Sequence, residues 1–136
     1  MNTLIQTNDL KQLKTQLNTK HWLVACLCAA WCDTCNIYRK AFEELIARHP
    51  DKCFAWIDIE DQAHLVEDIE IENFPTILIQ YDDEVAFLGT MLPDASQLHR
   101  LITSLEESMQ SGPIKRNSLN QEAPEHWSLR QLILSD

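Results

Sequence analysis

Glycine, positive charge and long apolar runs are all scarce in this chain of 136 residues. Gly89 and Gly112 are its only glycines, so we expect Asp, Asn and Pro to form most of the turns. Eleven Lys and Arg stand against 21 Asp and Glu, which gives a formal net charge of −10 at pH 7. Because such a charge repels polyphosphates and anionic lipids, we expect no nucleic acid and no membrane among the partners.

Signals for export are also missing. The first twenty residues are polar and lack the apolar core of a signal peptide. The apolar run at residues 22–32 is shorter than the roughly 20 residues that span a bilayer. The five cysteines are an odd number, and four of them lie between Cys26 and Cys35, which is not the pattern of a secreted disulfide framework. We therefore expect a reducing, cytoplasmic location.

Hydrophobic periodicity predicts alternating strands and helices in residues 1–111, which we expect to form one domain. Strands are expected at residues 3–6, 22–29, 54–59, 76–81 and 85–88, the last two forming a hairpin around residues 82–84. Helices are expected to follow a cap at Thr7 or Asn8, to run from near Cys32 to about His49 and over residues 63–71, and to begin at the N-cap Asp94. In the second of these helices, Ile37, Phe42, Leu45 and Ile46 recur at roughly helical spacing and are expected to face the core.

Residues 112–136 are expected to form a C-terminal extension. Its first part, residues 113–124, is polar and contains two prolines, as a linker or loop does. A short amphipathic segment then carries Trp127, Leu129, Leu132, Ile133 and Leu134. We expect this segment to fold onto the outside of its own domain, away from Cys32; the alternatives are a contact with a partner or a second copy, and disorder.

Two cysteines lie where a strand is expected to turn into a helix, in Trp31-Cys32-Asp33-Thr34-Cys35. At the N-terminus of a helix, unpaired backbone N–H groups and the macrodipole favour an anion. We therefore expect Cys32 to supply a thiolate nucleophile. Cys35 follows about one turn later, where its sulfur can reach that of Cys32, so the pair is suited to reversible dithiol–disulfide chemistry.

This motif, followed about forty residues later by Asn73-Phe74-Pro75-Thr76, resembles the thioredoxin superfamily over roughly residues 1–108. The resemblance implies an α/β thioredoxin fold, with a central mixed β-sheet flanked by helices on both faces. It also implies an enzyme, a protein-disulfide oxidoreductase in which Cys32 attacks a substrate disulfide and Cys35 resolves the mixed disulfide. The implied partners are disulfide-containing protein substrates and a reductase such as a thioredoxin reductase, and no cofactor is implied.

The resemblance further implies a substrate-binding surface. Trp31 resembles the tryptophan that shields the reactive cysteine, with a simple packing role as the alternative. Pro75 resembles a cis-proline that faces the cysteines, with an ordinary trans turn proline as the alternative. In the cis form it would place the backbone of Phe74 and Thr76 beside the cysteines, ready to pair with an extended substrate peptide.

Three positions depart from the family pattern and are expected to tune the site. Asp33 and Thr34 replace the usual Gly and Pro between the cysteines. Asp33 adds a negative charge that disfavours the Cys32 thiolate and makes the couple more reducing, whereas loss of the proline acts in the opposite direction. Cys26 stands where the family has a buried aspartate that accepts a proton from the resolving thiol, a task that a neutral thiol performs poorly.

Two other interpretations of the cysteines remain open. Cys26, Cys28, Cys32 and Cys35 could together hold zinc or an iron–sulfur cluster. We expect no metal, because Cys26 and Cys28 lie on one face of a strand with no loop to wrap an ion, and we expect both, with Cys53, to be buried thiols. The five histidines show no ligand spacing and are expected at the surface: His21, His49, His64, His99 and His126.

The other interpretation is a thioredoxin-fold binding protein, such as an assembly chaperone or adaptor, whose cysteines are regulated by redox state rather than turned over. The extra C-terminal segment and the acidic stretch at residues 58–72 motivate it, since both add surface for partners. The substrate, the reduction potential and the oligomeric state stay open at this point.

Overall fold

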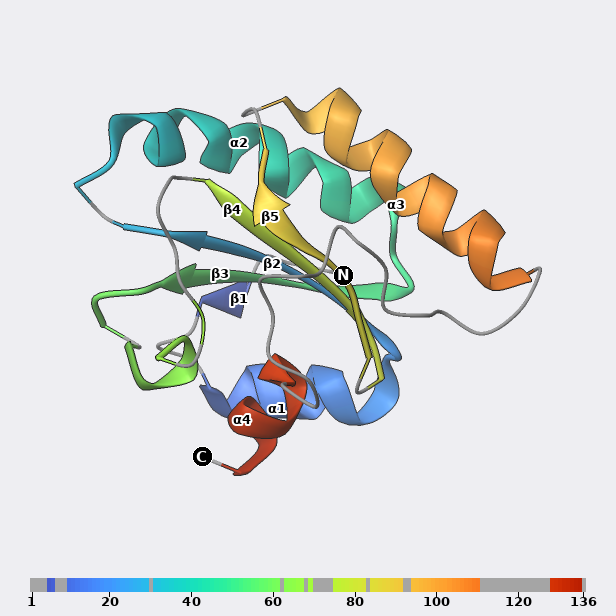
Figure 1. Ribbon diagram of the computed structural model, residues 1–136, viewed down its shortest axis with the longest axis horizontal. Coiled ribbons are helices and arrows are strands. Elements are labelled where there is room, and N and C mark those ends of the chain that lie inside the picture. The colour runs from blue at the N-terminus through green and yellow to red at the C-terminus, as the bar shows by residue number, and fades with distance from the viewer. Residues whose placement is uncertain are drawn as a thin grey trace.

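The computed structural model describes residues 5–6, 10–29, 31–61, 63–67, 69, 75–82, 84–91, 94–110 and 128–135. Within this part of the chain a mixed sheet lies between two layers of helices (Figure 1). The elements are β1 (Ile5–Gln6), α1 (Leu10–Thr19), β2 (Trp22–Cys28), α2 (Asp33–Arg48), β3 (Lys52–Asp58), η1 (Ala63–Leu65, a 3₁₀ turn), β4 (Thr76–Tyr81), β5 (Glu84–Thr90), α3 (Ala95–Gln110) and α4 (Leu129–Ser135).

The described strands form a sheet in the order β1-β3-β2-β4-β5. β3 is parallel to β1 and β2, and β4 is antiparallel to β2 and β5. The register pairs Leu27 near the end of β2 with Thr76 at the start of β4, and Cys28 with Asp58 on β3. The carboxyl end of β2, the beginning of α2 and the beginning of β4 therefore lie together at one end of the strands.

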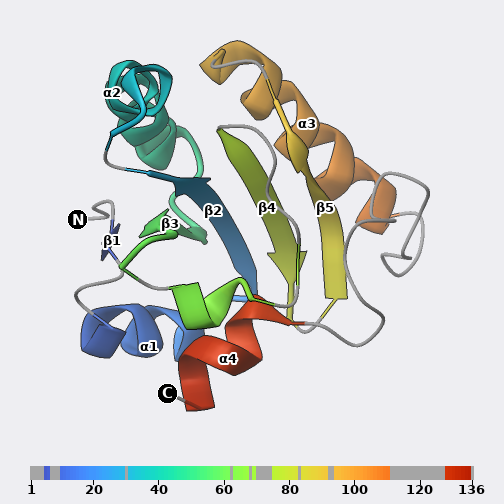
Figure 2. The same ribbon diagram turned by 60° about the vertical axis from the view of Figure 1, so that its left-hand side comes forward.

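Every residue of β2 is buried, because its side chains alternate between two cores. Figure 2 shows α2 and α3 on one face of the sheet, and α1, α4 and η1 on the other. The core under α1 and α4 includes Leu13, Leu17, Leu23, Ala25, Leu27, Leu129 and Ile133. The core under α2 and α3 includes Val24, Cys26, Cys28, Cys35, Tyr38, Phe42, Leu98 and Ile102. The predicted fold class, a mixed sheet with helices on both faces, is confirmed.

The hairpin and the cap of the last predicted helix are also confirmed. β4 and β5 pair antiparallel, and Asp82 between them has a φ of 48°, a left-handed conformation that Asp tolerates better than most residues. Asp94 accepts a hydrogen bond from the Ser96 N–H through Oδ1 at 2.9 Å, as an N-cap residue does. Both signals are local, so they need no tertiary information.

The helix expected over residues 63–71 is wrong for the part that the structure describes. Only η1 is helical there, and the N–H groups of Val66 and Ile69 bond to carbonyls three residues earlier rather than four. The apolar residues Val66 and Ile69 are themselves three apart, and both are buried. A short turn with three residues per turn already places such a pair on one face, so both side chains are buried without a full α-helix. Residues 70 and 71 lie outside the described residues.

Ile37 is the second correction, because its side chain is 78% exposed rather than in the core. The buried face of α2 consists of Cys35, Tyr38, Phe42, Leu45 and Ile46. Ile37 precedes Tyr38 by one position and so points about 100° away from it around the helix.

The C-terminal segment folds back onto its own domain, as expected. Leu129 and Ile133 of α4 have no exposed surface and join the same core as Leu13 and Leu17 of α1. This core lies on the face of the sheet opposite α2, away from Cys32. The predicted linker and Trp127 lie outside the described residues, and the boundary at residue 111 stays a prediction. In the described part of the chain, no helix combines the length and apolar character needed to cross a membrane.

Candidate active site

Cys32 is the N-cap residue of α2, as the sequence predicted. Its backbone is extended, with φ −85° and ψ 114°, and within the described residues its side chain caps no backbone N–H. A turn brings the helix start back to the end of β2, because the Cys32 N–H donates to the Ala29 carbonyl at 3.0 Å. The thiol is free and half-buried, so it stands at the positive end of a 16-residue helix with access to solvent.

Cys35 lies in the first turn of α2 and is completely buried. It forms a disulfide with Cys28, the last residue of β2, and the two Cα atoms are 6.0 Å apart. That separation lies in the usual range for a disulfide. The structure therefore holds Cys35 bonded to a partner that sequence reasoning did not propose, while Cys32 remains a thiol. The exchange roles of Cys32 and Cys35 stay predictions.

Sequence reasoning missed Cys28 as a redox partner because it treated the cysteines of the strand as core residues. One signal was available in the sequence. Cys28 ends the apolar strand, and the helix that carries Cys35 must begin just beyond it, so both residues border the same turn. Cys26 shares the face of Cys28, two positions earlier.

Cys26 is fully buried, and its Sγ lies 3.3 Å from the Sγ of Cys28. Burial raises the pKa of Cys26, and the nearby Cys32 raises it further, so this group stays a protonated thiol at neutral pH. The sulfur of Cys28 carries no hydrogen in the disulfide, so Cys26 donates its S–H toward Cys28. Cys53 is a core thiol, as expected: it packs on the other face of the sheet, and burial raises its pKa to about 12.

The residues that flank the cysteines along the chain are exposed. Asp33 and Thr34 begin α2 with their side chains in solvent. Trp31 is 67% exposed, so it does not serve as a core aromatic. Ile37, two residues after Cys35, is exposed as well. An exposed aromatic side chain next to a half-buried thiol suits contact with a partner protein.

Pro75 and Thr76 lie close to the cysteines through the sheet. Thr76 begins β4 and pairs with Leu27, so one further step of the same register places Pro75 opposite Cys28. Both residues are buried, and the Pro75 carbonyl accepts a hydrogen bond from the Met91 N–H at 3.2 Å. The cis form of Pro75 stays a prediction. Phe74, the third residue of the predicted peptide-binding element, lies outside the described residues.

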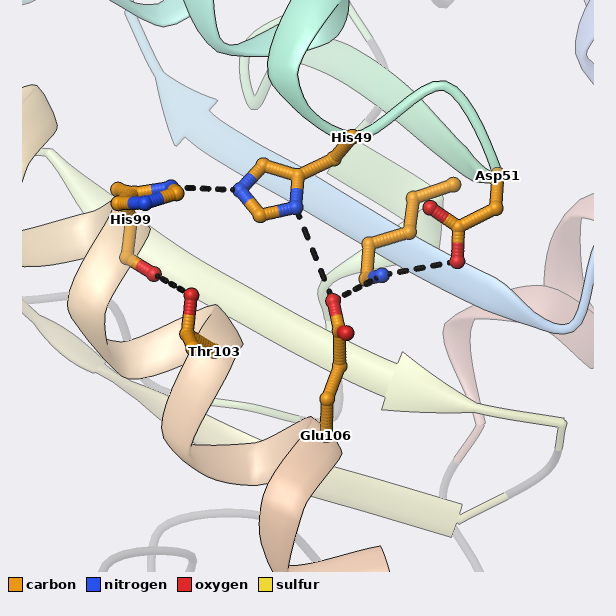
Figure 3. A network of polar contacts seen from close by, with 6 residues as sticks. His49, Asp51, His99, Thr103 and Glu106 are labelled. Carbon is orange, nitrogen blue, oxygen red and sulfur yellow. Dashed lines mark hydrogen bonds and ion pairs between the residues drawn. The ribbon is translucent and has the colours of Figure 1, made fainter.

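A polar network at the other end of α2 was not predicted. Figure 3 shows Asp51 and Glu106 beside a buried lysine, Lys52 at the start of β3, with His49 next to Glu106 and His99 on the far side of His49. Lys52 Nζ donates to Asp51 Oδ2 at 3.0 Å and to Glu106, and lies 5.1 Å from the centre of the Trp22 ring. The length of α2, about 24 Å for 16 residues, separates this network from Cys32. We therefore assign it to the packing of α3 on the sheet.

The expectation that all five histidines lie at the surface is wrong for His49, which is 5% exposed. His49 follows the last residue of α2, and its N–H bonds to the carbonyls of Leu45 and Ile46. Its ring packs near Phe54 and shares a 2.9 Å hydrogen bond with His99. Packing of α3 over this helix end buries the ring, which no local pattern could indicate. His126 lies outside the described residues.

A metal centre was the alternative use of the clustered cysteines. Within the described residues, no group of three or more His, Cys, Asp or Glu side chains is arranged to hold a metal ion. Cys28 and Cys35 are bonded to each other, so neither sulfur is a thiolate ligand in this structure.

The family model for thioredoxin matches residues 4–106. Among curated proteins, Thioredoxin H2-1 of Oryza sativa subsp. japonica is 28% identical over 96 residues, which are 69% of this chain and 67% of that protein. Thioredoxin domain-containing protein 2 of Mus musculus is 34% identical over 80 residues, or 57% of this chain. The match spans only 15% of the length of the mouse protein.

Solved structures agree with the fold. The oxidised form of mitochondrial thioredoxin 3 from Saccharomyces cerevisiae has a TM-score of 0.62 at 20% identity, covering 75% of this chain and 95% of that one. A complex of ferredoxin:thioredoxin reductase with thioredoxin f2 matches with a TM-score of 0.63 at 18% identity, covering 76% and 96%. Likeness at these identities shows the fold alone.

The family match and the strand–CxxC–helix arrangement point to the same chemistry. At the level of the family, they support a thiol–disulfide oxidoreductase. The thioredoxin model covers most of the chain, including all strands of the described sheet, and the chain therefore belongs to the thioredoxin family.

Proposed function

We propose that this chain is a protein-disulfide oxidoreductase in which Cys32 is the nucleophile and Cys35 the resolving thiol. The observation that carries the proposal is their placement on α2. Cys32 is half-buried at the N-cap with a free thiol, and Cys35 lies three residues on in the buried first turn. Residues three apart at a helix start lie on one side of it, so we expect the reduced Cys35 sulfur to be within reach of the Cys32 sulfur.

The reaction follows from this placement. The Cys32 thiolate attacks one sulfur of a substrate disulfide, forms a mixed disulfide and releases the other substrate sulfur as a thiolate. Cys35 then loses its proton and attacks the Cys32 sulfur, which releases the second substrate thiolate. Two electrons have passed to the substrate, and Cys32 and Cys35 are joined. A reductase, such as a thioredoxin reductase, returns two electrons by attacking the half-buried Cys32 sulfur, which is the more accessible of the two.

The surroundings of Cys32 support a protein substrate. Trp31 and Ile37 offer exposed apolar contacts on either side of the motif. Thr76 already pairs with Leu27 on one side and Thr90 on the other. Pro75 has no N–H, and its carbonyl accepts from the Met91 N–H, so a substrate strand would pair with the backbone of Phe74. We propose a cytoplasmic location, where a reductase can keep such thiols reduced.

Reduction of insulin by dithiothreitol tests the proposal. The wild-type chain is expected to accelerate precipitation of the insulin B chain, and Cys32→Ser to abolish the acceleration. Cys35→Ser is expected to accumulate a mixed disulfide instead of turning over. Cys53→Ser is the matched control, since Cys53 is a buried thiol on the opposite face of the sheet and should leave the rate unchanged.

The binding interpretation keeps one observation in its favour. While Cys35 is bonded to Cys28, it cannot resolve a mixed disulfide on Cys32, so the chain would hold a partner covalently rather than release it. This alternative predicts no Cys32-dependent turnover of insulin. A wild-type chain that is folded, reduced at the start and inactive in the assay would favour the binding function over the oxidoreductase.

A further inference from the structure

Cys35 stands within bonding reach of two different cysteines. It is bonded to Cys28 across the strand–helix turn, with 6.0 Å between the Cα atoms. It also follows Cys32 by three residues at the start of α2, where helix geometry places the two Cα atoms about 5 Å apart, a separation that a disulfide can span. One buried sulfur can therefore form either of two disulfides, and only the first leaves Cys32 free.

We propose that Cys28 is a third redox-active residue, which moves the disulfide from Cys32–Cys35 to Cys28–Cys35 after each oxidation. The proposal rests on the oxidoreductase function proposed above. Its consequence is that the oxidised protein keeps a solvent-accessible, nucleophilic Cys32 thiol while the disulfide lies in the core. Oxidation then does not remove the reactive group from the surface.

The shift balances without an external oxidant or reductant. The Cys28 sulfur, as the thiolate, attacks the Cys35 sulfur of the Cys32–Cys35 disulfide. The new S–S bond joins Cys28 to Cys35, the old one breaks, and Cys32 leaves as a thiolate. One proton passes overall from the Cys28 thiol to the Cys32 thiolate. No net electrons enter or leave the chain, and the reverse reaction returns the disulfide to Cys32.

Cys26 is placed to assist this step as a hydrogen-bond donor. Its Sγ lies 3.3 Å from that of Cys28, and burial raises its pKa so that it keeps its proton. A donor at this position stabilises negative charge on the Cys28 sulfur, both when Cys28 attacks and when it leaves in the reverse direction. Cys26 is therefore a positioning residue for the exchange and need not be oxidised itself.

Because Cys28 and Cys35 are buried, we expect their disulfide to be reduced through Cys32. Cys28 is 1% exposed and Cys35 is 0% exposed, so a reductant in solution cannot contact either sulfur. The Cys32 thiol of the same chain is the neighbour that can attack Cys35 and bring the disulfide back to the surface. A chain without the Cys32 thiol should hold the Cys28–Cys35 disulfide against reduction.

Disulfide mapping of the full-length chain tests the shift. The reduced protein is oxidised with diamide and quenched in acid, and the remaining thiols of the monomer are blocked with N-ethylmaleimide in denaturant. Chymotrypsin, cutting after Leu27, Trp31 and Tyr38, gives peptides 28–31 and 32–38. We expect these two peptides to be linked, with the maleimide on Cys32. A maleimide on Cys28, with an internal disulfide in peptide 32–38, would overturn the proposal.

Two variants and one control sharpen the result. Cys28→Ala should trap the oxidised chain as Cys32–Cys35, with no maleimide on Cys32. In Cys32→Ser, both the formation of Cys28–Cys35 by diamide and its loss to dithiothreitol should be at least about tenfold slower than in the wild type under native conditions, because neither reagent reaches the buried sulfurs. Equal rates would contradict the role of Cys32. Cys53→Ala should give the wild-type map, because Cys53 lies in the other core.

The disulfide map tests the shift and the insulin assay tests the oxidoreductase, so one proposal can be rejected while the other is kept. Turnover of insulin together with a map that shows only Cys32–Cys35 rejects the shift and keeps the oxidoreductase. A Cys28–Cys35 map without Cys32-dependent turnover rejects the oxidoreductase and leaves the exchange among the three cysteines standing. The map is made on the wild-type chain, so its outcome does not depend on whether a variant folds.

Discussion

The side chain of Gln80, which is completely buried in β4, donates a hydrogen bond to Ser128 at the beginning of α4. The same amide nitrogen donates to the Asp82 carbonyl at 3.0 Å, and the amide oxygen accepts from the Arg130 N–H at 3.4 Å. Ser128 Oγ in turn accepts from the Gln131 N–H at 3.2 Å, as an N-cap does. A polar residue in the sheet thus fixes where the C-terminal helix begins.

We predict that Gln80 and Ser128 act as one unit in stability. Gln80→Leu should lower the free energy of unfolding by about 1 to 3 kcal/mol, because it leaves buried polar groups of α4 without a partner. Ser128→Ala should cost about 1 kcal/mol through the lost cap. Urea unfolding of both single variants and the double variant measures their coupling. Strictly additive losses would show that the hydrogen bond contributes little.

Removal of the C-terminal segment should destabilise the domain without closing the active site. A chain that ends at Ser111 loses the burial of Leu129 and Ile133, so we expect its free energy of unfolding to fall by about 3 to 5 kcal/mol. Insulin reduction, measured well below the midpoint of unfolding, should stay near the wild-type rate. A several-fold rise in activity at unchanged stability would identify the segment as a lid over the cysteines instead.

Protonation of His49 should make the protein less stable in mild acid. Burial, with help from Lys52 and His99, holds the pKa of His49 below its ordinary value of 6.5. As the pH falls below 6.5, His49 becomes protonated in the unfolded chain but stays neutral in the folded chain. The free energy of unfolding therefore falls with pH until the pH reaches the pKa of His49 in the folded state. Urea midpoints across this range should therefore decrease as the pH is lowered.

His49→Gln is the matched control for that prediction. It keeps a polar side chain of similar size and removes the titrating group, so its urea midpoint should vary less between neutral and mildly acid pH. The same pH dependence in the variant and the wild type would place the titration on another group.

Cys32 should be the first thiol of the reduced protein to react with iodoacetamide. It is partly exposed at the N-terminus of α2, whereas Cys26, Cys28, Cys35 and Cys53 are buried. Peptide mapping after brief labelling identifies the site. Preferential labelling of Cys35 or Cys26 would reject the assignment of Cys32 as the nucleophile.

Asp33→Asn should increase the rate of that labelling. The substitution removes a negative charge from the residue next to Cys32. Loss of one exposed charge on a neighbouring residue should change the labelling rate by about two- to fivefold. The difference should shrink in high salt, because Asp33 is exposed and its field is screened. An unchanged rate at low salt would show that the carboxylate points away from the thiolate.

Short stretches of sequence are enough to predict the elements that depend on neighbouring residues. The strand before Trp31, the helix after Cys32, the hairpin around Asp82 and the Asp94 cap each follow from local patterns of apolar residues, turn formers and caps. The position of Cys32 at the start of a helix belongs to this group. These features need only contacts within a few residues, so their signals are local.

Packing between helices and strands decided which cysteines are bonded and which side chains are buried, because both depend on which faces of these elements meet. The meeting of β2 and α2 gave Cys35 the partner Cys28, and the packing of α3 buried His49. The direction in which α2 faces the sheet left Ile37 in solvent. The sequence could show that these cysteines are close along the chain, but only the fold decides which sulfurs lie within bonding distance.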